Sequence, residues 1–147
     1  MQYECYRLFS NLSALVKTKE KGDRRGIGLA APQIGYPLRL AVIWSTGSKR
    51  FLPLINPEIV WQSKRTRLGL PNKRNPYEGC LSVPGVVGKV RRHIIIKVRY
   101  QTITGLTMYK KFKGLTGVIA QHEIDHLNGI VFTQRIAEQQ GKIIKLP

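Results

Sequence analysis

The sequence predicts an α+β fold with antiparallel sheets. Three observations support this prediction: most apolar segments are short and bounded by turn residues, only two segments have helical periodicity, and strands and helices do not alternate regularly. Regular alternation would favour a parallel sheet instead. At 147 residues the chain is long enough for one hydrophobic core and too short for two ordinary domains, so we expect a single domain over residues 1–147.

The first expected element is an amphipathic helix over residues 1–21. Its apolar residues repeat at spacings close to helical, and lysines gather towards its end, where positive charge suits the helix dipole. The apolar residues are Tyr6, Leu8, Phe9, Leu12, Leu15 and Val16, and the lysines are Lys17, Lys19 and Lys21. We expect the helix to stop by Gly22, because residues 22–37 contain four glycines and two prolines and indicate loop or irregular strand.

The middle of the chain predicts strands and an exposed loop. Residues 38–44, LRLAVIW, indicate a buried strand. Residues 51–60 indicate one or two more strands, interrupted by Pro53 and Pro57. Residues 62–76 carry five basic residues and no acid, so we expect an exposed loop there.

Short strands and a β-hairpin are expected next. Residues 77–92 are rich in glycine and predict short strands. Residues 93–114 predict a hairpin, because their side chains alternate between two faces. Ile94, Ile96 and Val98 form one set, and Ile95, Lys97 and Arg99 form the other. The reversal should lie near Gly105, in a turn longer than two residues.

The second helix is expected over residues 115–127, where the hydrophobic period changes from two to 3.6. One stripe of this helix combines apolar residues with histidines: Leu115, Val118, Ile119, His122 and His126. Asn128 and Gly129 should end the helix, because both tolerate the left-handed conformation that a helix C-terminus commonly needs. Residues 129–134 predict a last short strand, followed by a brief basic tail from Ala137.

The charge of the chain is strongly positive. There are 25 Lys and Arg residues against 8 Asp and Glu, which gives a formal net charge of +17 and a pI near 10.4. Such a field attracts polyanions through salt-dependent phosphate contacts, which favours an RNA-rich neighbourhood. A generally solvated basic surface is the alternative.

The composition favours a cytoplasmic protein without a membrane anchor. No apolar run approaches the ~20 residues that span a bilayer. The N-terminal residues have no apolar core of the kind found in secretory signals, although a short organellar presequence is an alternative. The two cysteines, Cys5 and Cys80, are therefore expected in a reducing compartment, where a lone disulfide is disfavoured and a thiol serves more often as a ligand, a nucleophile or a small core residue.

The segment QHEIDH, residues 121–126, carries the strongest chemical signal. Residues four apart on a helix project to the same side, so His122 and His126 could hold one cation between them. Glu123 lies beside the first histidine and could take a proton from a bound water. The alternative is a pair of hydrogen-bonded core histidines, but these two occupy stripe positions that would otherwise be apolar.

A third ligand could lie on either side of this motif. Downstream, the only candidate is Glu138, in a tail that shows no sign of a second helix. Upstream, Cys80 lies in a glycine-rich segment that would present a thiolate, and it is the better candidate. His93 is weaker, because it starts a predicted strand. A thiolate with two imidazoles suits Zn²⁺ or Fe²⁺ and leaves a fourth position open for water.

Three segments together resemble the signature motifs of the peptide deformylase family. They are GIGLAAPQ at residues 26–33, EGCLS at residues 78–82 and QHEIDH at residues 121–126, in that order. The resemblance covers residues 26–132. It implies antiparallel sheets wrapped around a central HExxH helix, in a monomeric hydrolase that removes the formyl group from the N-terminal formylmethionine of nascent polypeptides.

The resemblance also implies roles for individual residues. Cys80, His122 and His126 would hold one divalent metal, usually Fe²⁺, with Zn²⁺, Ni²⁺ or Co²⁺ as substitutes, and Glu123 would be the general acid and base. The Gln33 amide and the Leu81 backbone N–H would stabilise the oxyanion. Ile27, Gly28 and Gly79 would bind the substrate peptide, with the segment around Gly28 pairing by strand addition.

The resemblance also covers two charged residues. Asp125 and Arg92 would support the ligands, or else be surface charges.

Many family members begin with a strand ahead of the first helix and end in a helix that contacts the ribosome. No such strand precedes Tyr6, and about twenty residues follow His126, so we expect a catalytic domain shortened at both ends. Its positive charge, including residues 62–76, would then provide affinity for ribosomal RNA.

Two other functions remain as alternatives at this point. A zinc endopeptidase of the HExxH kind would need a third ligand downstream of His126 and would cleave internal peptide bonds. A basic RNA-associated module with an inactive site would usually have lost at least one of the residues that the motifs place at the metal.

Overall fold

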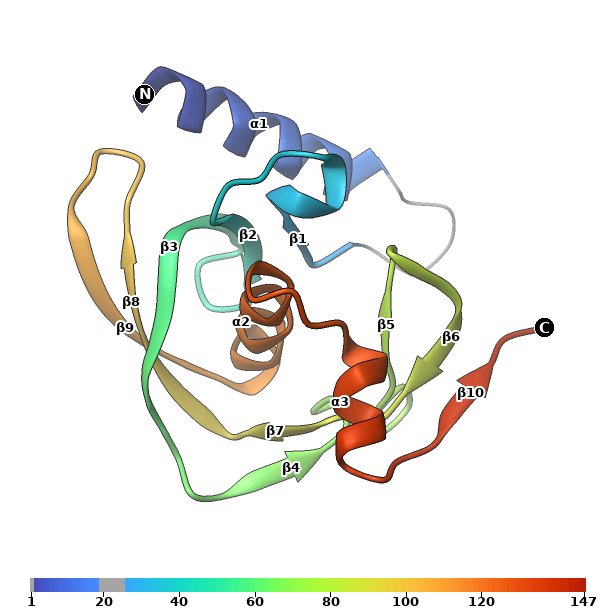
Figure 1. Ribbon diagram of the computed structural model, residues 1–147. Coiled ribbons are helices and arrows are strands. Elements are labelled where there is room, and N and C mark those ends of the chain that lie inside the picture. Colours follow the sequence, from blue (N-terminus) through green and yellow to red (C-terminus); the bar gives the residue numbers. More distant parts are fainter. Residues whose placement is uncertain (1, 19–25) are drawn as a thin grey trace.

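Helix α2 (Gly114–Leu127) lies at the centre of the protein, with strands curving around it (Figure 1). The computed structural model describes residues 2–18 and 26–147, and within the first helix it describes the side chains of residues 7–15. These residues form three α-helices, one short 3-10 helix and ten strands, and every paired strand is antiparallel. The predicted α+β class with sheets around the HExxH helix is confirmed.

The largest sheet has five strands in the order β1-β2-β3-β8-β9. They are β1 (Gly28–Ala30), β2 (Leu40–Ser45), β3 (Arg50–Gln62), β8 (Ile95–Gln101) and β9 (Thr107–Lys113). The predicted hairpin is formed by β8 and β9, and its connection includes Gly105, whose φ of 85° favours glycine. The prediction that this turn exceeds two residues is confirmed.

Strand β3 is one continuous strand, although its prolines suggested an interruption. Pro53 lies in the part of β3 that pairs with β2 only, because pairing with β8 begins at Ile55. One edge of the strand therefore needs no backbone N–H donor at this position. Pro57 lies within a register shift between Ile55 and Glu58, where the ladder is already irregular.

Two smaller sheets complete the wrapping. One has the order β10-β6-β5, formed by β5 (Glu78–Cys80), β6 (Val83–Gly88) and β10 (Ile143–Lys145). The other pairs β4 (Thr66–Leu68) with β7 (Arg91–His93). The prediction of an exposed loop over residues 62–76 is therefore wrong for β4, whose backbone pairs with β7, although most residues of this segment are exposed.

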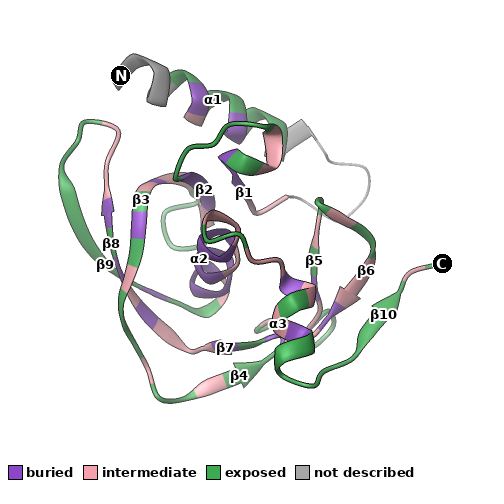
Figure 2. Ribbon diagram, viewed as in Figure 1, coloured by how far each residue is buried: buried purple, intermediate pink, exposed green. Residues whose placement is uncertain are grey.

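Helix α2 is buried because its apolar side chains fill the curve of the large sheet (Figure 2). Ile119, Ala120 and Ile124 pack in one cluster with sheet residues such as Ile43 and Val98. The helix ends as predicted, since Gly129 follows it with a φ of 76°. His122 and His126 therefore lie on a helix that is packed into the hydrophobic core.

Helix α1 (Gln2–Thr18) packs on one face of the large sheet, over β1 and β2. Leu8 and Leu12 are buried against Leu29, Leu40 and Val42, as the helical spacing predicted. The side chains of Cys5, Tyr6, Val16 and Lys17 lie outside the described residues, as do Lys19, Lys21 and the predicted stop at Gly22.

The C-terminal segment differs from the prediction. Residues 129–134 were expected to form a strand, but Phe132–Glu138 forms helix α3. Within the segment expected as a brief basic tail, Ile143–Lys145 forms strand β10. Phe132 and Ile136, one helical turn apart, are both buried in a cluster with Val90. No helix among the described residues is long and apolar enough to cross a membrane.

Candidate metal centre

Three side chains from two elements converge at one point. Cys80 ends β5, while His122 and His126 lie one turn apart on α2. The Cys80 Sγ and the His126 Nε2 are 3.2 Å apart, and the two Nε2 atoms are also 3.2 Å apart. Ligands of one tetrahedral Zn²⁺ would be separated by about 3.3 Å for two nitrogens and about 3.6 Å for nitrogen and sulfur. The geometry therefore fits a single divalent cation.

The electrostatics of these ligands also fit a cation. Burial opposes ionisation of the Cys80 thiol, but hydrogen bonds with His122, His126 and the Ser82 N–H outweigh it and lower its pKa to about 5. Burial also opposes protonation of His122, but Cys80 and Glu78 outweigh it and raise the pKa of His122 to about 10. A metal would take the place of that proton, because only the neutral imidazole ligates.

Glu78 fixes the orientation of the first histidine. Its Oε1 accepts a hydrogen bond of 2.9 Å from the His122 Nδ1, which leaves the Nε2 directed at the ligand cluster. Glu78 is buried, and although burial alone would raise its pKa, hydrogen bonds from His122 and Arg92 lower it. Glu78 was not among the residues predicted from the sequence. It stands two residues before Cys80 on one strand, so both face the same side, and this spacing could have identified it.

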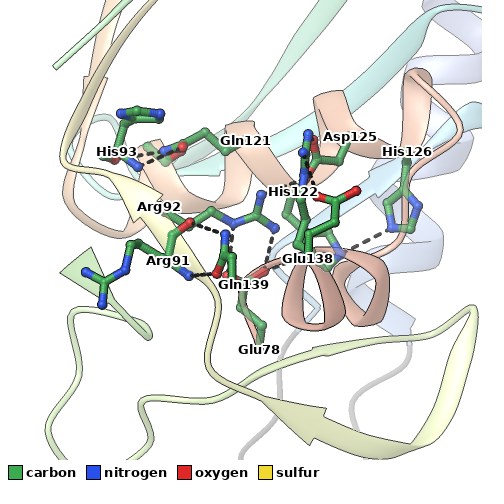
Figure 3. Close-up of polar contacts among 12 residues, drawn as sticks. Glu78, Arg91, Arg92, His93, Gln121, His122, Asp125, His126, Glu138 and Gln139 are labelled. Atoms are coloured by element: carbon green, nitrogen blue, oxygen red, sulfur yellow. Dashed lines mark hydrogen bonds and ion pairs between the residues drawn. The ribbon is translucent and has the colours of Figure 1, made fainter. Parts of the chain in front are cut away.

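Arg92 and Asp125 are both buried, and Figure 3 shows their polar contacts with neighbouring side chains. Arg92 donates to both oxygens of Glu78, at 3.1 and 2.9 Å, and to Asp125 at 2.6 Å. Arg135 from α3 binds Asp125 at 2.7 Å. The alternative of plain surface charges is therefore wrong, since this chain of ion pairs joins β5, β7, α2 and α3 behind His122.

Glu123 is placed beside the ligands without joining them. Its side chain is buried, and its Oε2 makes no hydrogen bond within residues 2–18 and 26–147. Burial raises the pKa of Glu123 to about 7, while the nearby His122 and His126 oppose this rise. A buried carboxylate oxygen without a partner is unfavourable unless it serves a ligand or a reaction. Glu123 is thus suited to exchange a proton near neutral pH.

Gln33 reaches the cluster from the 3-10 helix η1 (Ala31–Ile34). Its Oε1 accepts from the Ala30 N–H at 2.8 Å, which fixes the amide orientation. Its Nε2 then lies 3.0 Å from the Ser82 Oγ and 3.5 Å from the Cys80 Sγ. Leu81 follows Cys80 directly, in the turn between β5 and β6, so its backbone N–H belongs to the same segment as the thiol ligand.

Of the residues expected to bind substrate, Gly28 and Gly79 lie on edge strands and Ile27 directly precedes one. Gly28 begins β1, which ends the order of the large sheet, and Ile27 precedes it. A Cβ on Gly28 would lie 2.5 Å from the Glu123 Oε1, so the strand passes close to that carboxylate because the residue is glycine. Gly79 is exposed on β5, the edge strand of its own sheet.

The other candidate ligands lie elsewhere. Glu138 is exposed at the end of α3 and pairs with Arg135 at 3.2 Å. His93 lies at the end of β7, and its Nδ1 contacts the Ser63 carbonyl at 2.6 Å. Among the described residues, the side chains that could share one metal ion are Cys80, His122 and His126.

Known proteins match most of the chain. The family model of polypeptide deformylase matches residues 4–142. A peptide deformylase of Desulfotalea psychrophila is 38% identical over 127 residues, covering 84% of this chain and 70% of the relative. One of Desulforudis audaxviator is 46% identical over 110 residues, covering 75% and 66%. The crystal structure of peptide deformylase from Thermus thermophilus superposes with a TM-score of 0.81 at 32% identity, covering 95% of this chain and 76% of that one.

Proposed function

Because the chain belongs to the polypeptide deformylase family, we infer that it is a metal-dependent hydrolase that removes the formyl group from the N-terminal formylmethionine of nascent polypeptides. The match confirms the resemblance drawn from the three motifs. The chain spans about two thirds of the length of the curated relatives named above, 70% of one and 66% of the other. The observation that supports its activity most directly is the convergence of Cys80, His122 and His126 beside the buried Glu123.

The proposed chemistry divides the work among these side chains. A divalent ion held by Cys80, His122 and His126 would lower the pKa of a water and polarise the formyl oxygen. Glu123 removes a proton from the attacking water and passes it to the leaving amine. Its raised pKa, about 7, allows both transfers near neutral pH. Water then becomes part of the released formate, and the peptide gains a free amino group.

Two donors are proposed to stabilise the negative charge that develops on the formyl oxygen. The Nε2 of Gln33 points at the Cys80 side of the cluster, and the Ala30 N–H fixes that direction. The backbone N–H of Leu81 is the proposed second donor. Loss of one such donor lowers turnover by about 10² to 10³ in other hydrolases.

The substrate backbone is proposed to pair with the edge of β1. Gly28 lies at that edge and close to Glu123, so a peptide added there would carry its N-terminus towards the proton donor. Gly79 on β5 is the proposed contact from the other sheet.

Further properties of the protein follow from the family and the ligand set. Fe²⁺ is the proposed ion, with Zn²⁺, Ni²⁺ and Co²⁺ as substitutes, because a thiolate and two imidazoles accept each of them. We propose residues 1–147 as one catalytic domain that acts as a monomer in the cytoplasm, where thiols stay reduced. Its net charge of +17 supports transient contact with ribosomal RNA.

The deciding experiment measures formate release from formyl-Met-Ala-Ser by the Fe²⁺-loaded protein, together with metal content. Glu123→Ala is the control, and it should keep the metal while losing activity. Release of formate that depends on Glu123 supports the proposal. If the loaded protein releases no formate, the proposed function is wrong.

A further inference from the structure

The outer face of the large sheet carries aromatic and basic side chains in neighbouring positions. In the strand register, Lys97 of β8 lies between Trp61 of β3 and Lys111 of β9. Two residues further along β8, Arg99 lies between Glu58 of β3 and Tyr109 of β9. We call Trp61, Lys97, Arg99, Tyr109 and Lys111 the aromatic-basic face.

This face points away from the core. The alternate residues of β8 are buried, and they pack with Ile119 and Ile124 of helix α2. Figure 1 shows α2 inside the curve of β3, β8 and β9, so the aromatic-basic face lies on the opposite, convex side. Trp61 and Tyr109 are 49% and 58% exposed, so both side chains are accessible to a ligand.

The placement of the two lysines does not favour the stability of the sheet. Lys97 and Lys111 are directly opposite each other, and like charges in that position destabilise a sheet. Each lysine instead rests over an exposed ring: the Lys97 Nζ lies 5.7 Å from the centre of Tyr109, and the Lys111 Nζ lies 5.7 Å from the centre of Trp61. Such exposed contacts are weak, so both lysines can leave the rings for a phosphate.

The surrounding surface adds almost no negative charge. Of the acidic residues whose side chains the structure describes, only Glu58 and Glu138 are exposed, and each is bound by an arginine. Glu58 contacts Arg99 at 2.6 Å on this face, whereas Glu138 lies on α3. The face is therefore positive and complementary to a polyanion.

We propose that the aromatic-basic face binds single-stranded RNA, which goes beyond the proposed hydrolase function. Unpaired bases stack on Trp61 and Tyr109, while Lys97 and Lys111 contact the phosphates and Arg99 neutralises Glu58. Exposed aromatic residues between cations on a sheet are the arrangement that base stacking and backbone contact require. Double-stranded nucleic acid or a plain polyanion would use the lysines but gain nothing from the rings.

The test uses a fluorescein-labelled oligouridine RNA and the full, metal-loaded protein. Fluorescence anisotropy gives affinity against salt, and intrinsic tryptophan fluorescence reports stacking. Trp61→Leu should weaken binding by about tenfold and abolish the quenching, since stacking of a base contributes at this order. Lys97→Gln with Lys111→Gln should reduce the slope of log affinity against log salt by about 1.4 for two lost contacts.

A matched pair of lysines controls for bulk charge. Lys142 and Lys145 are exposed, near or within β10, which Figure 1 places across the molecule from β8 and β9. Lys142→Gln with Lys145→Gln removes the same charge and should leave affinity within about twofold if the contact is local. Tyr109→Ser is a second aromatic variant if Trp61→Leu does not fold. Circular dichroism and formate release, measured separately, show whether each variant is folded.

Two results would overturn the proposal. One is an equal loss of affinity in both lysine pairs, which would indicate a general electrostatic surface. The other is binding without tryptophan quenching, displaced as readily by inorganic polyphosphate as by unlabelled oligouridine. Both results are independent of formate release, so neither bears on the hydrolase function.

Discussion

The carboxylate of Glu78 holds the His122 ring through a hydrogen bond of 2.9 Å from Nδ1 to Oε1. The same carboxylate receives two hydrogen bonds from Arg92, so its position is fixed from both sides. A ring held in this way keeps its Nε2 lone pair directed at the position where Cys80 and His126 also point. Orientation of the ligand is thus determined by buried charges outside the ligand set.

Glu78→Gln should therefore weaken metal binding by about 10- to 100-fold, because a neutral amide holds the imidazole N–H less strongly. Competition with a chelator measures this loss directly. Excess metal should restore much of the formate release. Glu58→Gln is the matched control, since Glu58 is exposed and pairs with a surface arginine. Equal metal affinity in the Glu78 variant and the native protein would contradict the assigned role.

Gly28→Ala should lower formate release by about 10²-fold, the scale expected when a catalytic group moves by about 1 Å. The added methyl group would meet the Glu123 Oε1 at 2.5 Å and the Ile119 Cγ2 at 2.8 Å. The fall should appear mainly in kcat with metal content unchanged. Gly47→Ala is a suitable control, because a Cβ there meets nothing within 4 Å. A Gly28 variant with native kcat would show that the carboxylate is not constrained by β1.

Periodicity predicted the parts of the fold that have a regular pattern of burial. The stripe that includes Ile119 and His122 indicated α2, and the alternation around Lys97 indicated the β8–β9 hairpin. The α3 helix was missed because Phe132 and Ile136 are only two positions, too few to establish a helical period. The β4 strand was missed because its residues, such as Arg67, show no alternation of apolar and polar side chains. Its pairing with β7 is made by the backbone and needs no apolar side chain.

The candidate site was also only partly predictable from the sequence. The residues of the three motifs, including Cys80 and Gln33, meet in space as the resemblance implied. The partners behind them were harder to predict, since Arg92 reaches Glu78 and Asp125 only through the pairing of distant strands and helices. Tertiary contacts of this kind leave no periodic signal along the chain.

Removal of the metal should lower the melting temperature. Cys80, His122 and His126 join β5 to α2, so an ion bound to the folded state alone stabilises that link. Saturation at a thousand times the dissociation constant contributes about 4 kcal/mol. For a chain of this size each kcal/mol corresponds to about 3 °C. Differential scanning calorimetry with and without a chelator measures the shift. Cys80→Ser should show a much smaller shift, and an equal shift would contradict the role of the thiol.

Arg92→Met should destabilise the fold strongly. The arginine lies between Glu78 and Asp125, and all three side chains are buried. Its loss leaves Glu78 without its main cation and Asp125 with Arg135 alone, and breaking such a buried network typically costs about 3–5 kcal/mol. Urea unfolding of both proteins gives the difference in the free energy of unfolding. Arg99→Met is the control, since Arg99 and Glu58 are exposed and solvent screens their pair, so little change is expected. An equal loss of unfolding free energy in both variants would contradict this prediction. It would show that the buried Arg92 network contributes no more to stability than the exposed pair, and that Arg92 is not needed to fix Glu78 behind His122.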